Sequence, residues 1–438
     1  MKEFDAIIGY TAVKRELEQI ADVLKNASPY EKLGVAPPRG LMLHGEPGVG
    51  KTLMAKALIK ASGRKCFICR KDQPNGDFIK AIKKTFDQAA AEAPSIVFLD
   101  DMDKFSNGDE RRPNAEEYVT VQSCIDENRD KDVFVLATAN NLRCLPRSLP
   151  RAGRFDRNIQ IDAPHGEDAE RITAYYLSQK KFVSDVDAQA IARIMDGRSC
   201  AELETVINEA GLYAGLERSE SITMKHFMKA CMKTIFNMPE SEPSEEDDCL
   251  SNLCDTDSIF SQIRYHEAGH AVVHELLFPG SVTLVSVRGS GGHIGGFTSY
   301  YDNPRVHPAY RTKGKIIAFL GGMAATEQVY GVHDWGASRD LDRVFEIIRK
   351  LVVNDCICGF HLHFSRHRDS EELIARQEQA IAVEVEKAFR KAKEILVGNR
   401  EFLDAIAAEL TQKEFLTALD VKRIKAECHI APASIGSI

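Results

Sequence analysis

The stretch GLMLHGEPGVGKTLMAKALIKAS, residues 40–62, decides the fold of the first half of the chain. It predicts a short apolar strand, a glycine-rich turn and a helix, and the turn GEPGVGKT matches the P-loop pattern. Glycines let backbone N–H groups face phosphates at a helix N-terminus, whose dipole favours anions. A glycine-rich turn alone can be structural, but strand, Lys-Thr pair and helix are in register here and favour a nucleotide site. The residues predicted to hold the nucleotide are Gly45, Glu46, Pro47, Gly48, Val49, Gly50, Lys51 and Thr52.

The turn and a later strand predict a magnesium site. Lys51 is expected to hold the β- and γ-phosphates of ATP, and Thr52 to ligate magnesium. Further along, the apolar strand SIVFLDD ends in Asp100 and Asp101. We expect Asp100 to bind magnesium through water and Asp101 to orient the attacking water, since the partner P-loop makes a simple turn cap a poorer explanation.

A third strand and an arginine-rich segment add to the nucleotide site. The strand VFVLATAN brings Asn140 to the same sheet edge, where we expect it to sense the γ-phosphate. The segment RAGRFDR offers Arg151, Arg154 and Arg157. Arginine stabilises a transferring phosphoryl group, so these side chains are candidates for reaching a neighbouring subunit's nucleotide, with surface salt bridges as the alternative.

The chain changes character along its length. Its first part alternates apolar runs such as GLMLH and SIVFLD with helical stretches, which is typical of an α/β domain whose parallel sheet carries helices on both faces. A shorter helical part follows, in which Ser199 and Glu202 predict a capping box. An acidic stretch without Lys or Arg then indicates a linker, and the rest is mainly helical with one strand-like interruption. The predicted divisions are residues 1–164, 165–238, the linker 239–257, 258–430 and a tail 431–438.

The sequence HEAGH at residues 266–270 predicts a zinc site. Inside the helical run QIRYHEAGHAVVHELL, its spacing puts His266 and His270 on one helix face, close enough to share one ion. Glu267 would face the open metal position and accept a proton from water, because zinc brings the pKa of water towards about 7. This chemistry makes a peptide bond hydrolysable at neutral pH.

A third protein ligand is needed, and spacing alone leaves it open. Asp340 and Glu327 are the preferred candidates, because both are acidic and lie on downstream helical stretches. His274 is a further turn along the same helix, too far to share the ion easily. Surface positions are preferred for the later cluster of His361, His363 and His367.

Composition narrows the function. A formal charge of -8 gives no long-range attraction for nucleic acid or anionic lipid, so neither is a predicted partner. The start MKEFDAIIGY has no signal-peptide core, and the longest apolar run, 316–325, is about half of a membrane span. Eleven scattered cysteines indicate reduced thiols and a cytoplasmic location. Cys66 and Cys69, in a strand expected to be buried, are interpreted as structural thiols rather than metal or redox groups.

In their order, these motifs resemble those of the FtsH-type AAA+ ATP-dependent zinc metalloproteases over about residues 4–427. The matching stretches are FDAIIGY, GEPGVGKT, RAGRFDR, YHEAGHAVV, GGMAATEQVYG and GASRDLDR. The resemblance implies an AAA+ module with a helical lid, a mostly helical zinc peptidase domain, and a homo-hexameric ring. Such a ring would use ATP and Mg²⁺ to deliver unfolded or loosely folded proteins to zinc-dependent cleavage.

The resemblance also assigns individual residues. GASRDL aligns with the family segment that carries a zinc-binding aspartate, which selects Asp340 and leaves Glu327 to support the ligands. Arg154 and Arg157 match the family's arginine fingers, and Asn140 matches its sensor. A strand that would pair with the substrate backbone beside the zinc is matched by Gly296, Phe297 and Thr298.

Four departures from the family pattern modify these expectations. The family's N-terminal transmembrane segments are missing, which predicts a soluble enzyme. Asp101 replaces the usual glutamate and is one methylene shorter, which predicts slow ATP hydrolysis. The segment CRKDQPNGDFIKAIKK lacks the pore-loop triplet of aromatic, apolar residue and glycine, with Pro74 in the aromatic's place or the loop deleted, which argues against threading of folded proteins. TIFNMPE lacks the hinge glycine, so inter-ring flexibility would depend on the acidic linker.

Three functions compete at this point. Intact HEAGH and Asp340 favour an ATP-dependent endopeptidase. The altered pore loop and Asp101 favour an ATP-driven remodeller or chaperone with a weak or uncoupled peptidase domain. In the third, an ATP-independent peptidase uses nucleotide only to maintain its ring.

Overall fold

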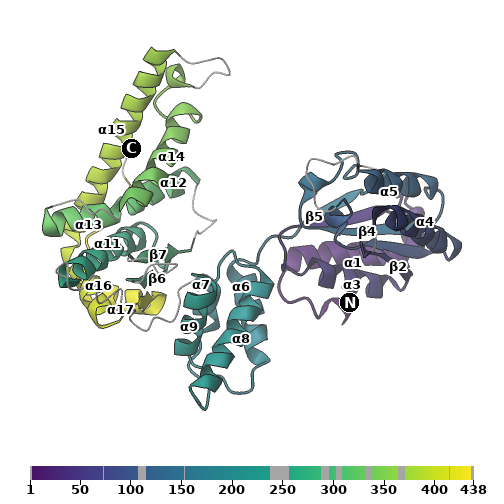
Figure 1. Ribbon diagram of the computed structural model, residues 1–438, viewed down its shortest axis with the longest axis horizontal. Helices are drawn as coiled ribbons and strands as arrows, with labels where there is room; N and C mark the ends of the chain where they lie inside the picture. The colour runs from purple at the N-terminus through teal and green to yellow at the C-terminus, as the bar shows by residue number, and fades with distance from the viewer. Residues whose placement is uncertain are drawn as a thin grey trace. The chain divides into compact units, whose positions relative to one another are not determined.

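The computed structural model of the protein describes most of the chain, in stretches separated by short gaps. These are residues 2–72, 74–106, 115–151, 153–236, 256–287, 295–301, 308–331, 337–363, 370–413 and 415–435. They divide into two compact units, Met1–Leu212 and Tyr213–Ile438, and each is described by itself (Figure 1). Of the predicted acidic linker, residues 239–255 lie outside the described stretches. Within those stretches, no helix is both long enough and apolar enough to cross a membrane.

The first unit is built on a parallel sheet of five strands in the order β2-β3-β4-β1-β5. Every residue of β3 is buried, whereas β2 leaves Ile68 62% exposed. The expectation that CFIC forms a buried strand is therefore wrong, because β2 is at the edge of the sheet. The strands are β1 Gly40–His44, β2 Lys65–Cys69, β3 Ser95–Leu99, β4 Val133–Ala139 and β5 Arg157–Gln160.

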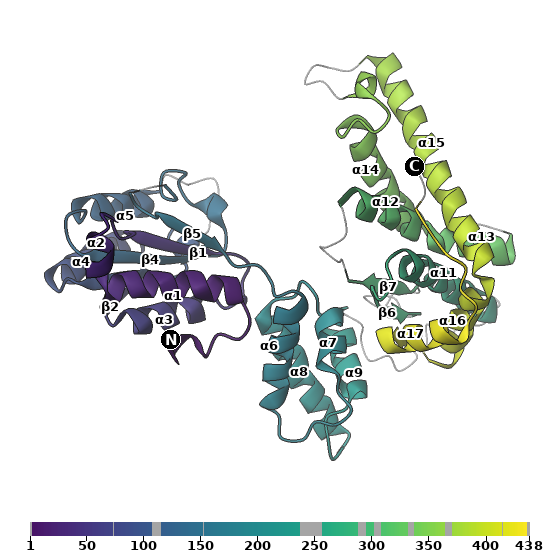
Figure 2. The same ribbon diagram turned by 180° about the vertical axis from the view of Figure 1, so that it is seen from behind.

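Helices cover both faces of this sheet, as the alternation of apolar runs predicts. The α-helices are α1 Thr11–Lys25, α2 Ala27–Glu31, α3 Lys51–Ser62, α4 Asn75–Ala91 and α5 Glu116–Glu127, and the 3-10 turns are η1 Lys2–Phe4, η2 Met102–Lys104 and η3 Leu142–Cys144. Helices α1 and α3 pack together on one face and α4 and α5 on the other (Figures 1 and 2). Phe78 of α4 and Tyr118 of α5 are fully buried between helix and sheet.

Parallel pairing brings the carboxyl ends of the strands to one edge. Leu99 pairs with Cys69 on one side and with Ala137 on the other. His44 at the end of β1 pairs with Ala139. Loops at this edge are where open α/β sheets bind ligands. The residues that follow these strand ends are Gly45, Arg70, Asp100 and Asn140.

A group of helices follows the sheet. These are α6 Gly166–Ser178, α7 Ala188–Ile194, α8 Cys200–Leu216 and α9 Met224–Thr234, and the boundary between the two units falls inside α8. The predicted capping box is confirmed, since the Ser199 N–H donates to Glu202 Oε2 at 2.8 Å and the Glu202 N–H to Ser199 Oγ at 3.3 Å. The start of α8 lies against the P-loop, where the Ala201 N–H donates to the Gly48 carbonyl at 3.1 Å. A Cβ on Gly48 would lie 2.8 Å from the Ala201 Cβ, so only glycine permits this approach.

The second unit is mainly helical around a small antiparallel sheet of order β7-β6-β8. Its strands are β6 Val282–Ser286, β7 Phe297–Tyr300 and β8 Phe415–Thr417. Its helices are α11 Thr256–Leu277, α12 Pro308–Phe319, α13 Gly321–Tyr330, α14 Ser338–Val353, the 3-10 turn η6 Phe360–Leu362, α15 Glu371–Gly398, α16 Arg400–Gln412 and α17 Ala418–Glu427. Helix α11 packs against α13, α16 and the strands β6 and β7, and α14 lies along α15 (Figures 1 and 2). The strand-like interruption predicted in this part of the chain contains the strands β6 and β7.

Candidate active sites

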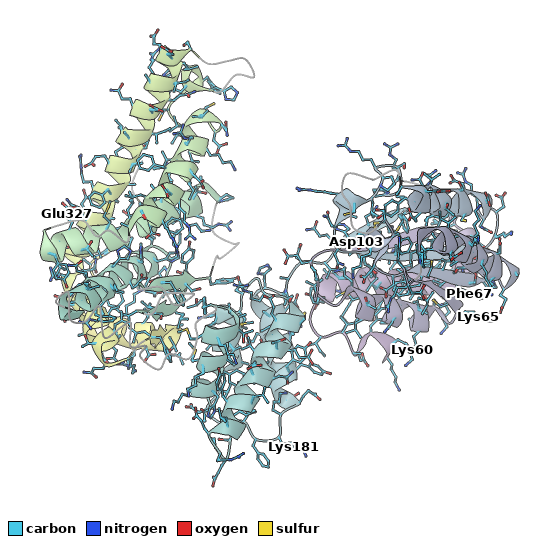
Figure 3. The ribbon with its side chains drawn as sticks, viewed as in Figure 1. Lys60, Lys65, Phe67, Asp103, Lys181 and Glu327 are labelled. Carbon is cyan, nitrogen blue, oxygen red and sulfur yellow. The ribbon has the colours of Figure 1, made fainter. Side chains whose placement is uncertain are left out.

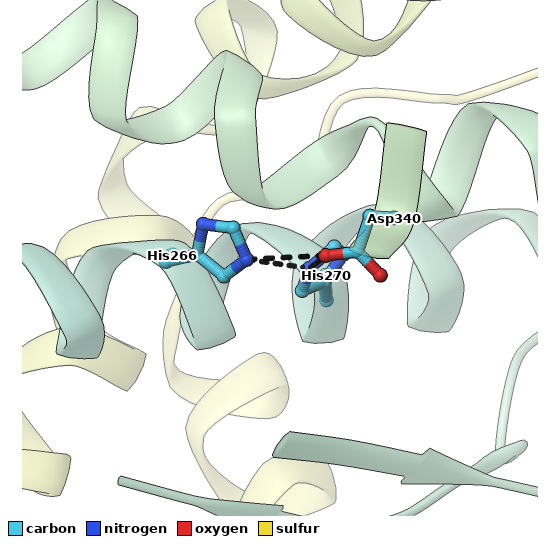
Figure 4. A group of neighbouring side chains, drawn as sticks. All are labelled: His266, His270 and Asp340. Atoms are coloured by element: carbon cyan, nitrogen blue, oxygen red, sulfur yellow. Dashed lines mark hydrogen bonds and ion pairs between the residues drawn. The ribbon is translucent and has the colours of Figure 1, made fainter. Parts of the chain in front are cut away.

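Three metal-ligating side chains meet within the second unit (Figure 4). His266 and His270 come from α11, and Asp340 comes from the first turn of α14. The two Nε2 atoms lie 3.0 Å apart. Asp340 Oδ2 lies 3.4 Å from Nε2 of His266 and 3.2 Å from Nε2 of His270. One helix and the start of a second, distant helix thus bring three ligating atoms to one point.

These separations fit a tetrahedral zinc ion. Zinc binds nitrogen and oxygen at about 2.0–2.1 Å, which places two ligands of a tetrahedron about 3.3–3.4 Å apart. The three measured separations, 3.0, 3.2 and 3.4 Å, lie close to that value. Three protein ligands leave a fourth position open, as in catalytic zinc sites. A bound zinc ion would supply Lewis-acid chemistry there, making hydroxide available near neutral pH.

Hydrogen bonding and charge prepare the ligands for a cation. His270 Nδ1 lies 2.8 Å from the carbonyl oxygen of Ala318. Because a carbonyl only accepts, Nδ1 carries the hydrogen, and Nε2 keeps its lone pair for the metal. Burial raises the pKa of Asp340, but the adjacent imidazoles of His266 and His270 outweigh it and hold that pKa well below its usual range. The Asp340 carboxylate is therefore anionic.

Glycines give the imidazoles their space. Helices α11 and α13 touch backbone to backbone, because a Cβ on Gly269 would lie 2.3 Å from the Gly321 carbonyl oxygen. The next residue, Gly322, faces both ligands. A Cβ there would lie 2.6 Å from Nε2 of His266 and 2.6 Å from Nε2 of His270, closer than real Cβ atoms approach. Any side chain at position 322 would enter the volume where the two ligating atoms meet.

Glu267 is positioned as a buried carboxylate beside the ligands. Its side chain follows His266 on α11, and the residue is 4% exposed. Thr298 of β7 donates its hydroxyl hydrogen to Glu267 Oε2 at 2.8 Å. A Cβ on Gly296 would lie 2.4 Å from Glu267 Cγ, so the chain before β7 closes tightly over this side chain. Burial raises the pKa of Glu267 above its ordinary value.

The other candidate ligands have different partners. Glu327, on α13, accepts a hydrogen bond from Lys393 Nζ at 3.0 Å (Figure 3). The ring of His274 stacks on Tyr300 with centroids 4.1 Å apart, and its Nδ1 lies 2.8 Å from Ser281 Oγ. Within the described stretches, the group of ligating atoms around His266 includes neither residue. His361 and His363 are exposed, as predicted, and His367 lies outside the described residues.

The predicted nucleotide residues gather at the carboxyl edge of the first unit's sheet. Lys51 Nζ donates to the carbonyl oxygens of Gly45 and Glu46, at 2.8 and 2.6 Å, inside the P-loop. Burial lowers the pKa of Lys51. Thr52 Oγ1 donates to Asp100 Oδ1 at 3.3 Å, which joins the hydroxyl and the carboxylate predicted to serve magnesium. Hydroxyl and carboxylate oxygens are the ligands that magnesium prefers.

Asp100 sits in a network that spans three strands. Its Oδ1 also accepts from Thr138 Oγ1 at 2.9 Å, and its Oδ2 accepts from Arg70 Nη2. Burial raises the pKa of Asp100, but the Arg70 and Thr138 hydrogen bonds outweigh it, and the net shift is downwards. Asp100 is thereby kept ionised, although the residue is only 1% exposed.

Asp101 and Asn140 flank this network. Asp101 has a left-handed backbone with φ of 54°, its N–H donates to Thr138 Oγ1 at 2.9 Å, and Lys104 Nζ donates to its Oδ2 at 2.7 Å. The backbone N–H of Asn140 donates to Oδ1 of buried Asp103 at 3.0 Å (Figure 3 labels Asp103). Asp103 therefore fixes the turn after β4.

The predicted arginine fingers differ in their surroundings. Arg154 Nη2 donates to Asp126 Oδ2 at 2.7 Å within the same chain, and Nη1 donates to the Ser148 carbonyl at 3.3 Å. Arg157, the first residue of β5, is exposed, as is Arg151. A reach towards another subunit would require Arg154 to leave Asp126.

The segment predicted to replace the family's pore loop connects β2 to α4. Lys71 Nζ donates to the Phe105 carbonyl at 2.5 Å and to Glu117 Oε1 at 3.4 Å. The first aromatic residue after this connection, Phe78, is fully buried against the ring of Phe105, with centroids 4.8 Å apart. Phe78 is therefore a core residue and not an exposed aromatic side chain.

Four groups that contribute to the sites were not predicted from the sequence. They are Arg70, Thr138, Gly322 and the carbonyl of Ala318. For Thr138 a signal exists, since a hydroxyl within an otherwise apolar strand two residues before Asn140 faces the sheet edge. For Gly322, the GG pair in a helical stretch is a signal of close packing. Arg70 and Ala318 give no local signal, because tertiary structure alone sets their partners.

Comparison with known proteins finds a matching family for each of the two candidate sites. Residues 41–163 match the model of the ATPase family associated with various cellular activities (AAA), and residues 185–229 match the AAA+ lid domain. Residues 260–424 match peptidase family M41. The chain is 30% identical to the ATP-dependent zinc metalloprotease FtsH of Caldicellulosiruptor bescii, over 97% of this chain and 72% of the relative. It is 29% identical to the protein of the same name from Pelobacter propionicus, over 98% of this chain and 72% of the relative. It is also 29% identical to the protein of that name from Thermotoga maritima, over 97% of this chain and 73% of the relative.

The fold and the two sites define a class of protein in which an AAA ATPase and a zinc peptidase share one chain. Alignment extends across both halves and the lid between them. The chain belongs to the FtsH family of ATP-dependent zinc metalloproteases. Its cofactors are therefore zinc, ATP and magnesium.

Proposed function

We propose that Glu267 is the general base of peptide hydrolysis, beside a zinc ion held by His266, His270 and Asp340. The convergence of three ligating atoms from α11 and α14 carries this proposal. Thr298 would hold the Glu267 carboxylate towards the open metal position, where it takes a proton from water. The edge strand β7, which begins at Phe297 after Gly296, would pair with the substrate backbone.

The ATPase half would drive substrate delivery. The P-loop residues 45–52 would bind the phosphates, and Asp100 with Thr52 would hold magnesium, which their direct hydrogen bond supports. Asp101 would orient the attacking water and Asn140 would sense the γ-phosphate. The exposed Arg157, and Arg154 once released from Asp126, would reach the nucleotide of a neighbouring subunit.

We propose a cytoplasmic homo-hexamer that degrades unfolded or loosely folded proteins. The arginine-rich segment after residue 150 supports a ring, because fingers act on a neighbour's site. Loosely folded substrates are proposed because CRKDQPNGDFIKAIKK lacks the triplet of aromatic, apolar residue and glycine, and because its Phe78 is buried. The domain limits proposed are those predicted at residues 164, 238, 257 and 430.

Casein cleavage with and without ATP tests the coupling. Wild type, Glu267→Gln, Lys51→Ala and the control Glu378→Gln, an exposed glutamate of α15, would be compared. The proposal expects cleavage by wild type and control with ATP, and loss in the other two variants. Loss in Glu267→Gln alone would mean a peptidase independent of ATP. No cleavage by the wild type, with nucleotide-dependent remodelling retained, would mean a chaperone.

A further inference from the structure

An arginine that the family motifs do not include occupies the predicted magnesium site. Arg70 directly follows β2, and its Nη2 donates to Oδ2 of Asp100. The Arg70 side chain is 61% exposed, while that of Asp100 is 2% exposed. An exposed cation thus lies on the one carboxylate oxygen of Asp100 that Thr52 and Thr138 leave open.

The limited hydrogen-bond capacity of the Asp100 carboxylate makes Arg70 and magnesium competitors for the same oxygen. A carboxylate oxygen has two lone pairs, and Oδ1 of Asp100 already accepts from two hydroxyls, Thr52 Oγ1 and Thr138 Oγ1. A hydrated magnesium ion at this site must therefore reach Oδ2, directly or through one of its waters. Arg70 holds that position, and two cations repel each other there.

There is space beside Asp100 into which the Arg70 side chain can move. A cavity of about 450 Å³ opens beside the pair, lined by Arg70 and Asp100 together with Lys56 of α3, Thr85 of α4 and Asp72. Asp72 offers a second carboxylate in the same cavity, two residues after Arg70. The cavity therefore offers the Arg70 side chain room to leave Asp100 by a change of rotamer.

We propose that Arg70 is a positioning residue that competes with magnesium for Asp100, so that loading the nucleotide site with the metal releases the Arg70 side chain. This inference rests on the proposed role of Asp100 at magnesium. Its consequence is a link between the nucleotide site and the position of the Arg70 side chain, at the start of the connection from β2 to α4. Arg70 would lower the apparent affinity of the site for magnesium, and its side chain would change position when magnesium binds.

Magnesium-dependent nucleotide binding tests the proposal without any turnover. Binding of a fluorescent ADP analogue would be followed by anisotropy across a magnesium titration, for wild type, Arg70→Ala, Arg70→Gln and Arg70→Lys. Lys65→Ala is the matched control, because Lys65 begins β2 at the end opposite Arg70, is 59% exposed and pairs with Glu92 (Figure 3 labels Lys65). Arg70→Gln keeps the experiment informative if the alanine variant is unstable.

The expected result is a half-saturating magnesium concentration about fivefold lower in Arg70→Ala and Arg70→Gln, as for loss of a partly exposed ion pair. Arg70→Lys should lie nearer the wild type, and Lys65→Ala should match it. An unchanged or higher value in both Arg70→Ala and Arg70→Gln would overturn the inference. Asp100→Asn separates this failure from a wider one: if it leaves magnesium dependence unchanged, the proposed role of Asp100 itself is wrong.

Discussion

Thr298 on strand β7 donates its hydroxyl hydrogen to Glu267 Oε2 at 2.8 Å, and the same oxygen of Thr298 also lies 3.2 Å from the Glu267 carbonyl. The edge strand β7 is therefore hydrogen-bonded to the Glu267 carboxylate of helix α11, which also carries His266 and His270. Binding of a substrate along β7 and orientation of the base would share this contact.

Thr298→Val should lower the turnover number for peptide cleavage about tenfold, because one hydrogen bond to a charged group is lost. Valine keeps the shape of threonine, so zinc content and ATPase rate should be unchanged. Thr298→Ser retains the hydroxyl and should retain most of the activity. Equal activity in the valine and wild-type proteins would show that Thr298 does not orient the base.

Gly322→Ala should remove zinc and leave the fold in place. The added Cβ would lie 2.6 Å from both ligating nitrogens, so the imidazoles must move apart. We expect zinc affinity to fall about a hundredfold, measured by zinc content at equilibrium with a zinc buffer. Gly215→Ala is the control, since a Cβ there meets nothing within 4 Å. Tight zinc binding by Gly322→Ala would contradict the geometry of the site.

Asp101→Glu should raise the steady-state ATPase rate about three- to tenfold. The longer side chain reaches one methylene further towards the attacking water, and a misplaced group of this kind is costly. Asp101→Asn, which keeps the shorter length without the charge, should lower the rate. If Asp101→Glu leaves the rate unchanged or reduces it, the shorter residue is not what limits hydrolysis.

Asp126→Ala tests whether Arg154 serves another subunit. Arg154 pairs with Asp126 at 2.7 Å, and a partly exposed pair of this kind costs little to break. Freeing Arg154 should therefore raise the ATPase rate by up to about fivefold, whereas Arg154→Ala should lower it about a thousandfold.

Asp132→Ala is the matched control for that experiment. Asp132 is 61% exposed, compared with 52% for Asp126, and it pairs with Arg64 at 2.6 Å. Its removal should leave the rate unchanged. A loss of activity in Asp126→Ala but not in Asp132→Ala would show that Arg154 works within its own chain.

The first unit was largely predictable because its signals are local. A P-loop needs a strand before it and a helix after it, and the apolar runs that follow must pair in parallel. Their carboxyl ends then share one edge, which brings Asp100 and Asn140 to the P-loop without knowledge of the packing. The exposure of Ile68 was not predictable in this way, since strand order and not strand composition puts β2 at the edge.

The second unit was predictable only in part. Helical periodicity places His266 beside His270, but Asp340 follows 70 residues later, and only the resemblance to a family selected it over Glu327. The three-residue strand β8 has too few residues for a period to show. Contacts such as that of His270 with the Ala318 carbonyl depend on how helices pack, and backbone carbonyls leave no mark in a sequence.

Zinc stoichiometry in the wild type and in Asp340→Asn is the most direct test of the central claim, that His266, His270 and Asp340 share one ion. Both proteins would be equilibrated with a buffer holding free zinc at a fixed low concentration, and bound zinc would be measured by atomic emission. Asparagine keeps the size of the side chain and removes its charge. The account predicts about one zinc per wild-type chain and a large loss in Asp340→Asn. Equal zinc in the two proteins would contradict it.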